Sequence, residues 1–140
     1  MTFDYDTATL KASWGVYAIV RKQTGRMYIG HTADSFLMRW KTHWFALRAG
    51  KHINAGLQWD WLFFGETAFE FRILEAYTER LNWRQGKTAP WAQHREAVCI
   101  AQSRNLYNEM IPAACVLSGE QAKKWSKLLW DIYYTPDETD

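Results

Sequence analysis

Two tyrosines with glycine neighbours are the first residues of this chain whose types and spacing could support chemistry. They lie eleven residues apart, in a Gly-Val-Tyr stretch at 15–17 and a Tyr-Ile-Gly stretch at 28–30. A phenol can hydrogen-bond to other groups or, when a neighbour helps it lose its proton, act as a base. Tyrosine is also common in strands, so Tyr17 and Tyr28 taken singly are explained more simply as core or sheet-edge residues.

An arginine and a histidine follow at a spacing of four residues, Arg39 and His43. Residues four apart share one face of a helix, and this face borders an apolar stripe, at the margin between core and solvent where a cleft would lie. Each residue alone has a simpler explanation. Arg39 and His43 would then be a solvated helix edge. Two later polar residues also have simple explanations when taken singly: His52 as a loop or capping residue, and Asn108 as a turn residue.

A carboxylate interrupts an apolar helical stripe in the last third of the chain. Glu96 shares this stripe, at positions i, i+4, i+7, i+8 and i+11, with Ala92, Cys99, Ile100 and Ser103. Because an unpaired buried charge is costly, Glu96 should be paired, protonated or bound to a metal. A salt bridge to Arg95 or Arg104, or plain exposure, is the simplest alternative.

The residues around the two tyrosines predict a β-hairpin that would place both of them on one small sheet. Residues 16–20 form an apolar run, 22–25 read as a turn, and 26–30 form the returning run. The glycine at the end of the turn can adopt a positive φ.

Two helices are expected after the hairpin. Asp34 or Ser35 can cap the first, which ends near Ala49 before Gly50. Its inward stripe consists of Phe36, Leu37, Trp40, Trp44 and Leu47. The second helix spans 54–64 and ends at a glycine, and the residues expected to point inward are Ile53, Leu57, Trp61 and Phe64.

The remainder of the chain predicts one more strand and two more helices. Residues 69–76 alternate as a half-buried strand does, and 77–89 form a polar loop. A proline suits the first turn of a helix over 90–103, and 106–107 form a short extended piece. A capping box then opens a C-terminal helical extension at 118–134.

Length and composition indicate one globular domain over residues 1–140. No apolar run is long enough to span a bilayer, and residues 1–14 lack the layout of a signal peptide. Cys99 and Cys115 fit no metal-binding spacing, and we expect two free thiols in a reducing, cytoplasmic (intracellular) setting.

Positive charge is concentrated in the first half of the chain. Residues 11–60 carry eight Lys and Arg against two Asp. Such a surface can attract phosphates, although an ordinary solvated surface explains it as well. The three histidines in this stretch, His31, His43 and His52, have no recognised zinc-ligand spacing.

Taken together, these residues resemble the GIY-YIG nuclease family over about residues 14–110. The first motif has Val16 in place of the isoleucine, and the second is matched as it stands. The matching segments, in chain order, are 15–17, 28–30, 38–43, 50–52, 94–96 and 105–108. The resemblance implies an α+β fold with a small three-stranded antiparallel sheet flanked by helices, which agrees with the predicted elements. The extension at 118–134 has no recognised counterpart.

The resemblance also implies an endonuclease that hydrolyses phosphodiester bonds in DNA with one Mg²⁺ (or Mn²⁺) ion per active site. Glu96 would hold the metal and Arg39 the scissile phosphate. Tyr17 would be the general base. Since a phenol has a reference pKa of about 10, it needs a neighbour that accepts or stabilises its proton. His43 is the first candidate for this neighbour and His52 the second.

The remaining site residues have supporting roles. Tyr28 would hydrogen-bond the phosphate or the attacking water, and Asn108 would orient the site. Further contacts to nucleic acid are assigned to Lys41, Lys51, Arg84 and Lys87.

The family resemblance does not define the target. A standalone nuclease of a phage or mobile element is favoured, and a compact restriction-type enzyme comes next, as monomer or homodimer and without membrane association. Single- and double-stranded DNA are not distinguished. A catalytically inactive nucleic-acid-binding module of the same fold is the main alternative, and a partner-binding domain that uses exposed tryptophans is a third.

Overall fold

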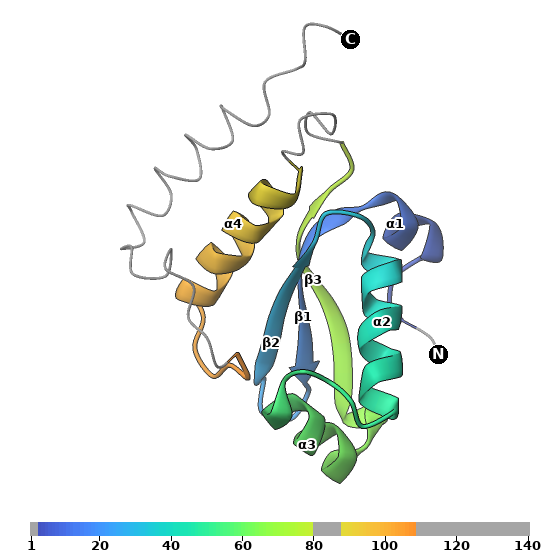
Figure 1. Ribbon diagram of the computed structural model, residues 1–140, viewed down its shortest axis with the longest axis vertical. Helices are drawn as coiled ribbons and strands as arrows, with labels where there is room; N and C mark the ends of the chain where they lie inside the picture. Colours follow the sequence, from blue (N-terminus) through green and yellow to red (C-terminus); the bar gives the residue numbers. More distant parts are fainter. Residues whose placement is uncertain (1–2, 80–87, 109–140) are drawn as a thin grey trace, which may run out of the picture.

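The computed structural model of the protein describes residues 3–79 and 88–108 (Figure 1). Its elements are α1 (Thr7–Ala12), β1 (Trp14–Arg21), β2 (Met27–Thr32), α2 (Phe36–Arg48), α3 (Ala55–Phe64), the 3₁₀ helix η1 (Glu66–Ala68), β3 (Phe69–Tyr77) and α4 (Thr88–Ala101). The predicted extension at 118–134, Cys115, and Arg84 and Lys87 lie outside the described residues. No helix in the two described segments is long and apolar enough to cross a membrane.

The three strands form one sheet in the order β2-β1-β3, and both pairs are antiparallel. Figure 1 shows α4 on one side of this sheet and α1 and α2 on the other. The expected α+β fold, with a three-stranded antiparallel sheet flanked by helices, is therefore confirmed.

The central strand β1 is buried along nearly its whole length because both faces of the sheet are covered. Tyr17 and Ile19 face the core under α2 and α3. Val16 and Ala18 alternate with them and face the second core, to which α4 contributes Ile100. Adjacent residues of β1 thus belong to different layers, as the two-residue period of a strand requires.

The predicted hairpin is confirmed. β1 pairs with β2 so that Tyr17 lies opposite Gly30 and Ile19 opposite Tyr28. The two tyrosines therefore project from the same face of the sheet. Gly25 closes the turn with a φ of 71°, a conformation that favours glycine.

Side-chain caps begin both predicted helices after the hairpin. The Ser35 hydroxyl accepts a hydrogen bond from the Met38 N–H at 3.2 Å, and the side-chain Oδ1 of Asn54 accepts one from the Leu57 N–H at 2.9 Å. The predicted inward stripe of α2 is also confirmed, since four of its residues are buried and Trp44 packs against them. Leu57 and Trp61 of α3 are buried as predicted.

Two residues assigned to the inner face of α3 are not in the core. Ile53 is 90% exposed because it precedes the Asn54 cap and so lies outside the helix. Phe64 is 40% exposed because it occupies the last position of α3, where its ring lies under the Arg21 guanidinium. The helical period gave the right face for the middle of α3 but failed at its ends.

The predicted loop at 77–89 is shorter at both ends than expected. Tyr77 completes β3, and α4 begins at Thr88, two residues before Pro90. The predicted strand at 69–76 is confirmed. The predicted extended piece at 106–107 lies beside the start of β2, where Leu106 bridges to Met27.

Candidate active site

Each tyrosine motif contains a glycine that the backbone geometry requires. The Tyr17 ring lies across Gly30, and a Cβ at Gly30 would be 2.5 Å from the Tyr17 hydroxyl. Gly15 has a φ of 142°, and a Cβ there would collide with the Glu75 carbonyl oxygen of β3. Directly after Gly15, the pairing with β3 shifts register between Val16 and Tyr17. The glycines thus permit the close packing that positions Tyr17.

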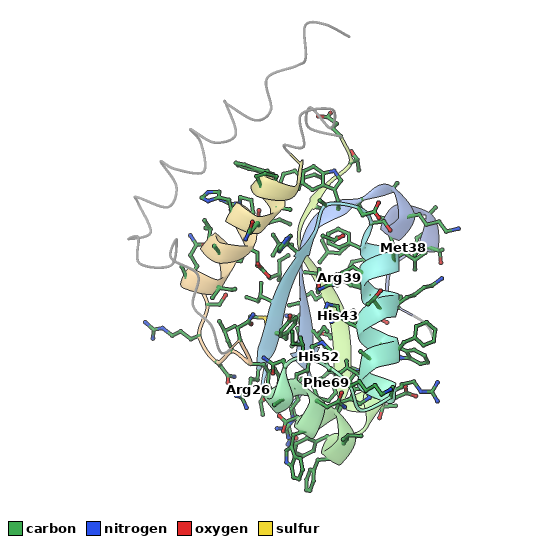
Figure 2. All side chains as sticks on the ribbon, viewed as in Figure 1. Arg26, Met38, Arg39, His43, His52 and Phe69 are labelled. Atoms are coloured by element: carbon green, nitrogen blue, oxygen red, sulfur yellow. The ribbon has the colours of Figure 1, made fainter. Side chains whose placement is uncertain are left out.

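A chain of three side chains starts at Tyr17 and runs into α2 and the segment before α3. The Tyr17 hydroxyl lies 2.5 Å from Nε2 of His43, and Nδ1 of His43 lies 2.7 Å from Nε2 of His52. All three residues are buried. Arg39, one helical turn before His43, is exposed, and its Nε donates to the Tyr17 hydroxyl at 3.3 Å. Figure 2 shows Arg39 and His43 on the side of α2 that faces the sheet, and His52 beyond the end of that helix.

Burial shifts the proton affinities of this chain. It raises the pKa of Tyr17, and the Arg39 guanidinium partly opposes that rise. Burial, with Arg39 and His52 nearby, lowers the pKa of His43 to about 3. The pKa of His52 is lowered too, mainly by burial. Both imidazoles are therefore neutral at physiological pH.

Glu96 approaches from α4, on the other side of the sheet. Its carboxylate Oε2 lies 3.0 Å from Nδ1 of His31, and 19% of its side chain is exposed. The simple alternative of a salt bridge to Arg95 or Arg104 is wrong. Arg95 donates from both Nε and Nη2 to Glu75, at 2.7 and 2.6 Å, and is thus directed away from Glu96.

The negative charge of Glu96 reaches the tyrosines at the β2 edge. Burial raises the pKa of Tyr28, Glu96 raises it further, and Arg39 lowers it. Glu96 also raises the pKa of Tyr17. Tyr28 packs edge-on against the rings of His43 and His52. The tyrosines, Arg39 and the histidine pair thus lie together, and Glu96 is near enough for its charge to act on both tyrosines.

Asn108 completes this edge as a backbone mimic. Its side-chain oxygen accepts from the Ile29 N–H and its amide donates to the Ile29 carbonyl, both at 2.9 Å. Ile29 lies between Tyr28 and Gly30 on the edge strand β2. Asn108 thus satisfies both backbone groups of one edge residue and fixes the strand at the site.

Two buried residues that sequence reasoning missed hold His52 in place. The side-chain Oε1 of Gln58 accepts from the His52 N–H at 2.8 Å, and its Nε2 donates to the Leu47 backbone carbonyl at 3.0 Å. The Asn54 N–H donates to Nδ1 of His52 at 3.0 Å. Gln58 is a polar residue one position from Leu57 on the buried side of α3, the same kind of anomaly that marked Glu96. Sequence reasoning also missed the role of His31. This residue follows Gly30 in β2, so its side chain lies on the opposite face of the sheet, where α4 packs.

The predicted nucleic-acid contacts are separated in space. Lys51 is exposed and directly precedes His52. Lys41 lies elsewhere on α2, where it lines a hollow with Phe3, Tyr5 and Leu10. Lys41 is therefore not brought to the tyrosine site.

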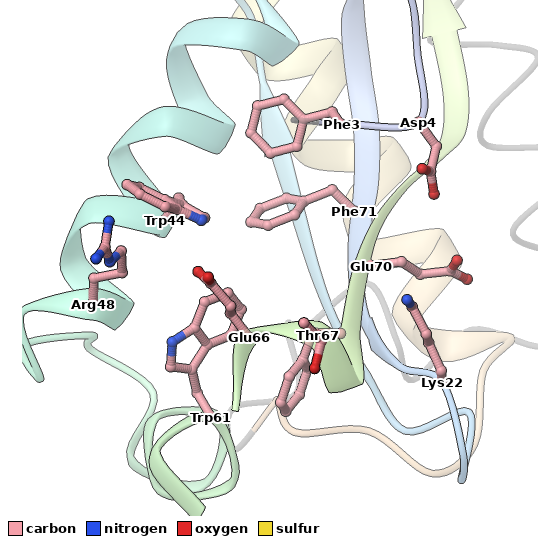
Figure 3. A pocket seen from close by; sticks show the side chains of 11 residues that line it. Phe3, Asp4, Lys22, Trp44, Arg48, Trp61, Glu66, Thr67, Glu70 and Phe71 are labelled. Atoms are coloured by element: carbon pink, nitrogen blue, oxygen red, sulfur yellow. The ribbon is translucent and has the colours of Figure 1, made fainter. Parts of the chain in front are cut away.

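A second hollow, of about 440 Å³, opens between α2, the end of α3 and β3 (Figure 3). It contains both acidic and basic side chains and none of the candidate catalytic residues. Its lining consists of Phe3, Asp4, Lys22, Trp44, Arg48, Trp61, Glu66, Thr67, Phe69, Glu70 and Phe71.

This arrangement belongs to a known class of catalytic domain. The GIY-YIG catalytic domain matches the chain over residues 13–108, more than half of its length. The protein therefore belongs to the GIY-YIG family. Nucleases of this family act on DNA and generally depend on a divalent metal.

Two solved structures are similar to the chain. The catalytic domain of the homing endonuclease I-TevI is 26% identical, with a TM-score of 0.48, and the match covers 69% of this chain and 98% of that one. A point variant of the catalytic domain of the intron endonuclease I-TevI is 25% identical, with a TM-score of 0.49 and coverages of 72% and 97%. A comparison with curated proteins gave no match.

Proposed function

We propose that this protein is a metal-dependent DNA endonuclease in which Tyr17 is the general base and Glu96 holds one Mg²⁺ or Mn²⁺ ion. The main support is that two unlike groups approach one another from opposite sides of the sheet. A tyrosine hydroxyl bonded to His43 and Arg39 comes from one side of the sheet. A carboxylate whose charge reaches that tyrosine comes from the other.

The surroundings of Glu96 fit a hard divalent cation. Nδ1 of His31 contacts Oε2 of Glu96, while Oε1 of Glu96 has no polar partner among the described residues. Within those same residues, no group of three His, Cys, Asp or Glu side chains could hold a metal together. Mg²⁺ is commonly held by one or two carboxylates together with water and substrate oxygens, so one carboxylate suffices. The bound ion would neutralise charge on the phosphoryl oxygens and stabilise the leaving 3′-oxygen.

Arg39 binds the scissile phosphate in this proposal. Its side chain is exposed, already touches the Tyr17 hydroxyl through Nε, and keeps its remaining N–H groups available. A guanidinium fork matches two phosphoryl oxygens. Arg39 thereby places the phosphorus atom next to Tyr17.

Tyr17 in its phenolate form takes a proton from the attacking water. Tyr28 lies on the same face of the sheet as Tyr17 and hydrogen-bonds the phosphate or that water. Asn108 keeps the edge strand β2 in position. Lys51 is an added phosphate contact beside His52.

The cellular setting of the proposed enzyme is reducing and intracellular, and the buried Cys99, which forms no disulfide, agrees with this. A standalone nuclease of a phage or mobile element stays the favoured subtype in this proposal.

Cleavage of supercoiled plasmid and of a labelled single strand, with and without Mg²⁺, tests the proposal. Wild type is compared with Glu96→Gln, which keeps the size of the side chain but removes its charge. Glu66→Gln is the matched control, because Glu66 is exposed at the hollow away from the site. We expect metal-dependent cutting by wild type and the control and none by Glu96→Gln.

Two other outcomes would contradict parts of this proposal. Equal cutting by wild type and Glu96→Gln would show that Glu96 is not the essential ligand. Salt-sensitive DNA binding with no cutting of any substrate, in Mg²⁺ or Mn²⁺, would favour the inactive nucleic-acid-binding module.

A further inference from the structure

The hydrogen-bond chain from Tyr17 to His52 ends at a backbone group that can only donate. The Asn54 N–H points at Nδ1 of His52 from 3.0 Å. Nδ1 must therefore offer a lone pair. A neutral imidazole carries one N–H, so the proton of His52 lies on Nε2.

The same reasoning passes to the next ring. Nε2–H of His52 faces Nδ1 of His43 at 2.7 Å, so Nδ1 of His43 accepts and its proton lies on Nε2. That N–H faces the Tyr17 hydroxyl oxygen at 2.5 Å. The reverse direction would place a second donor opposite the Asn54 N–H or require an imidazolate at His52. Burial lowers the pKa of both rings, which favours the neutral form of each.

We propose that His52 is a positioning residue that fixes the tautomer of His43, so that His43 donates to the Tyr17 oxygen and does not accept its proton. This inference rests on the proposed role of Tyr17 as a base. His43 and Arg39 then provide two N–H donors for the Tyr17 phenolate. Because Nε2 of His43 is already protonated, the phenol proton must leave by another route, to a water that reaches the hydroxyl beside the exposed Arg39. The phenolate is then ready to take a proton from the attacking water.

Gln58 holds the two histidines of this hydrogen-bond series in place. It bonds the backbone N–H of His52 and also the Leu47 carbonyl at the end of α2, the helix that carries His43. Both ends of the Gln58 amide are assigned unambiguously, because one partner is a donor and the other an acceptor. The distance between the two imidazoles is thus set by buried hydrogen bonds.

Long-range ¹H–¹⁵N NMR of the imidazoles in the metal-free, DNA-free protein tests the tautomers directly. The chain has four histidines, and single His→Gln variants assign their signals. We expect His43 and His52 both to be neutral and protonated on Nε2. A proton on Nδ1 of His43, or a doubly protonated His43 at pH 7, would overturn the proposal. This readout does not depend on whether the protein cleaves DNA.

A pair of isosteric variants tests the consequence for cleavage. His52→Gln can still offer an N–H toward His43, whereas His52→Glu offers a carboxylate and should draw the His43 proton to Nδ1. We expect His52→Gln to keep kcat within about tenfold and His52→Glu to lose on the order of 10²–10³ in kcat with little change in DNA affinity, as when a preorganised donor is removed.

The opposite result has a distinct meaning. If His43 accepted the Tyr17 proton, a carboxylate at position 52 would assist it, and His52→Glu would cut as fast as His52→Gln or faster. The His43 NMR signal in each variant shows whether the tautomer changed and whether the protein is folded. A wild type that never cuts would contradict the proposed function, while the NMR result would still decide the direction of the chain.

Discussion

Tyr17 and Glu96 belong to the same candidate site, yet their surroundings differ. Tyr17 is fully buried, and its hydroxyl already contacts His43 and Arg39. Glu96 is partly exposed, and among the described residues only its Oε2 has a polar partner, His31. The first half of the site is assembled by the protein alone, whereas the second half leaves ligand positions open. This is what a preorganised base and an exchangeable metal and phosphate require.

Tyr17→Phe is the largest test of the preassembled half. Removal of the hydroxyl should lower the cleavage rate by about 10³-fold or more, within the range of general-base effects, and leave DNA affinity nearly unchanged. It should also destabilise the fold by about 1–3 kcal/mol, because the buried Nε2 of His43 loses its partner. Single-turnover cleavage, fluorescence anisotropy with labelled DNA and urea unfolding measure the three effects. Full turnover by a folded Tyr17→Phe protein would remove Tyr17 from the base role.

Arg39→Ala should lower both the cleavage rate and the affinity for DNA, because Arg39 contacts Tyr17 and would also bind the phosphate. Arg39 is exposed, so its loss should leave the fold intact, while one phosphate contact and one donor to Tyr17 disappear. We expect a loss of about 10²-fold in rate, and a slope of log affinity against log salt that falls by about 0.9. Arg39→Lys should restore the salt slope more than the rate, because an ammonium lacks the fork. Normal cutting by Arg39→Ala would refute this assignment.

Gly30→Ala tests the packing that positions Tyr17. Its Cβ would lie 2.5 Å from the Tyr17 hydroxyl, and the buried ring has little room to move. Overpacking of this kind should cost about 1–3 kcal/mol in unfolding free energy and slow cleavage. Gly56→Ala is the control, since its Cβ would make ordinary contacts of 3.5 Å inside α3 and should be neutral or slightly stabilising. A Gly30→Ala protein as stable and active as wild type would show that Tyr17 is not held as described.

Much of the fold could be predicted because local patterns carry it. The hairpin follows from two apolar runs around a turn, and α2 from a cap, a stripe and a glycine. Glu96 stood out because a charge on an apolar stripe needs a partner. These are signals from residues near one another in the chain.

The parts of the site that could not be predicted depend on contacts between distant segments. His31 meets Glu96 across 65 residues, through the packing of α4 on β2. Gln58 joins His52 to the end of α2, because its side chain bonds both the His52 N–H and the Leu47 carbonyl. The Asn54 bond to His52 spans only two residues, but it depends on the backbone conformation before α3. The exposure of Ile53 follows from where the helix begins, which a periodic pattern defines poorly.

His31→Gln makes the smallest change and tests the open half alone. Gln retains a polar group near Glu96 but changes how the carboxylate is oriented. As with other partners of metal ligands, we expect metal affinity to weaken by about 10-fold or somewhat more, with kcat at saturating Mg²⁺ largely retained. Titration of cleavage with Mg²⁺ separates the two parameters. His94→Gln serves as the control, since His94 lies two residues before Glu96 on the same helix. A loss of kcat that added Mg²⁺ cannot restore would mean that His31 acts in the chemistry and that the second half of the site is as preassembled as the first.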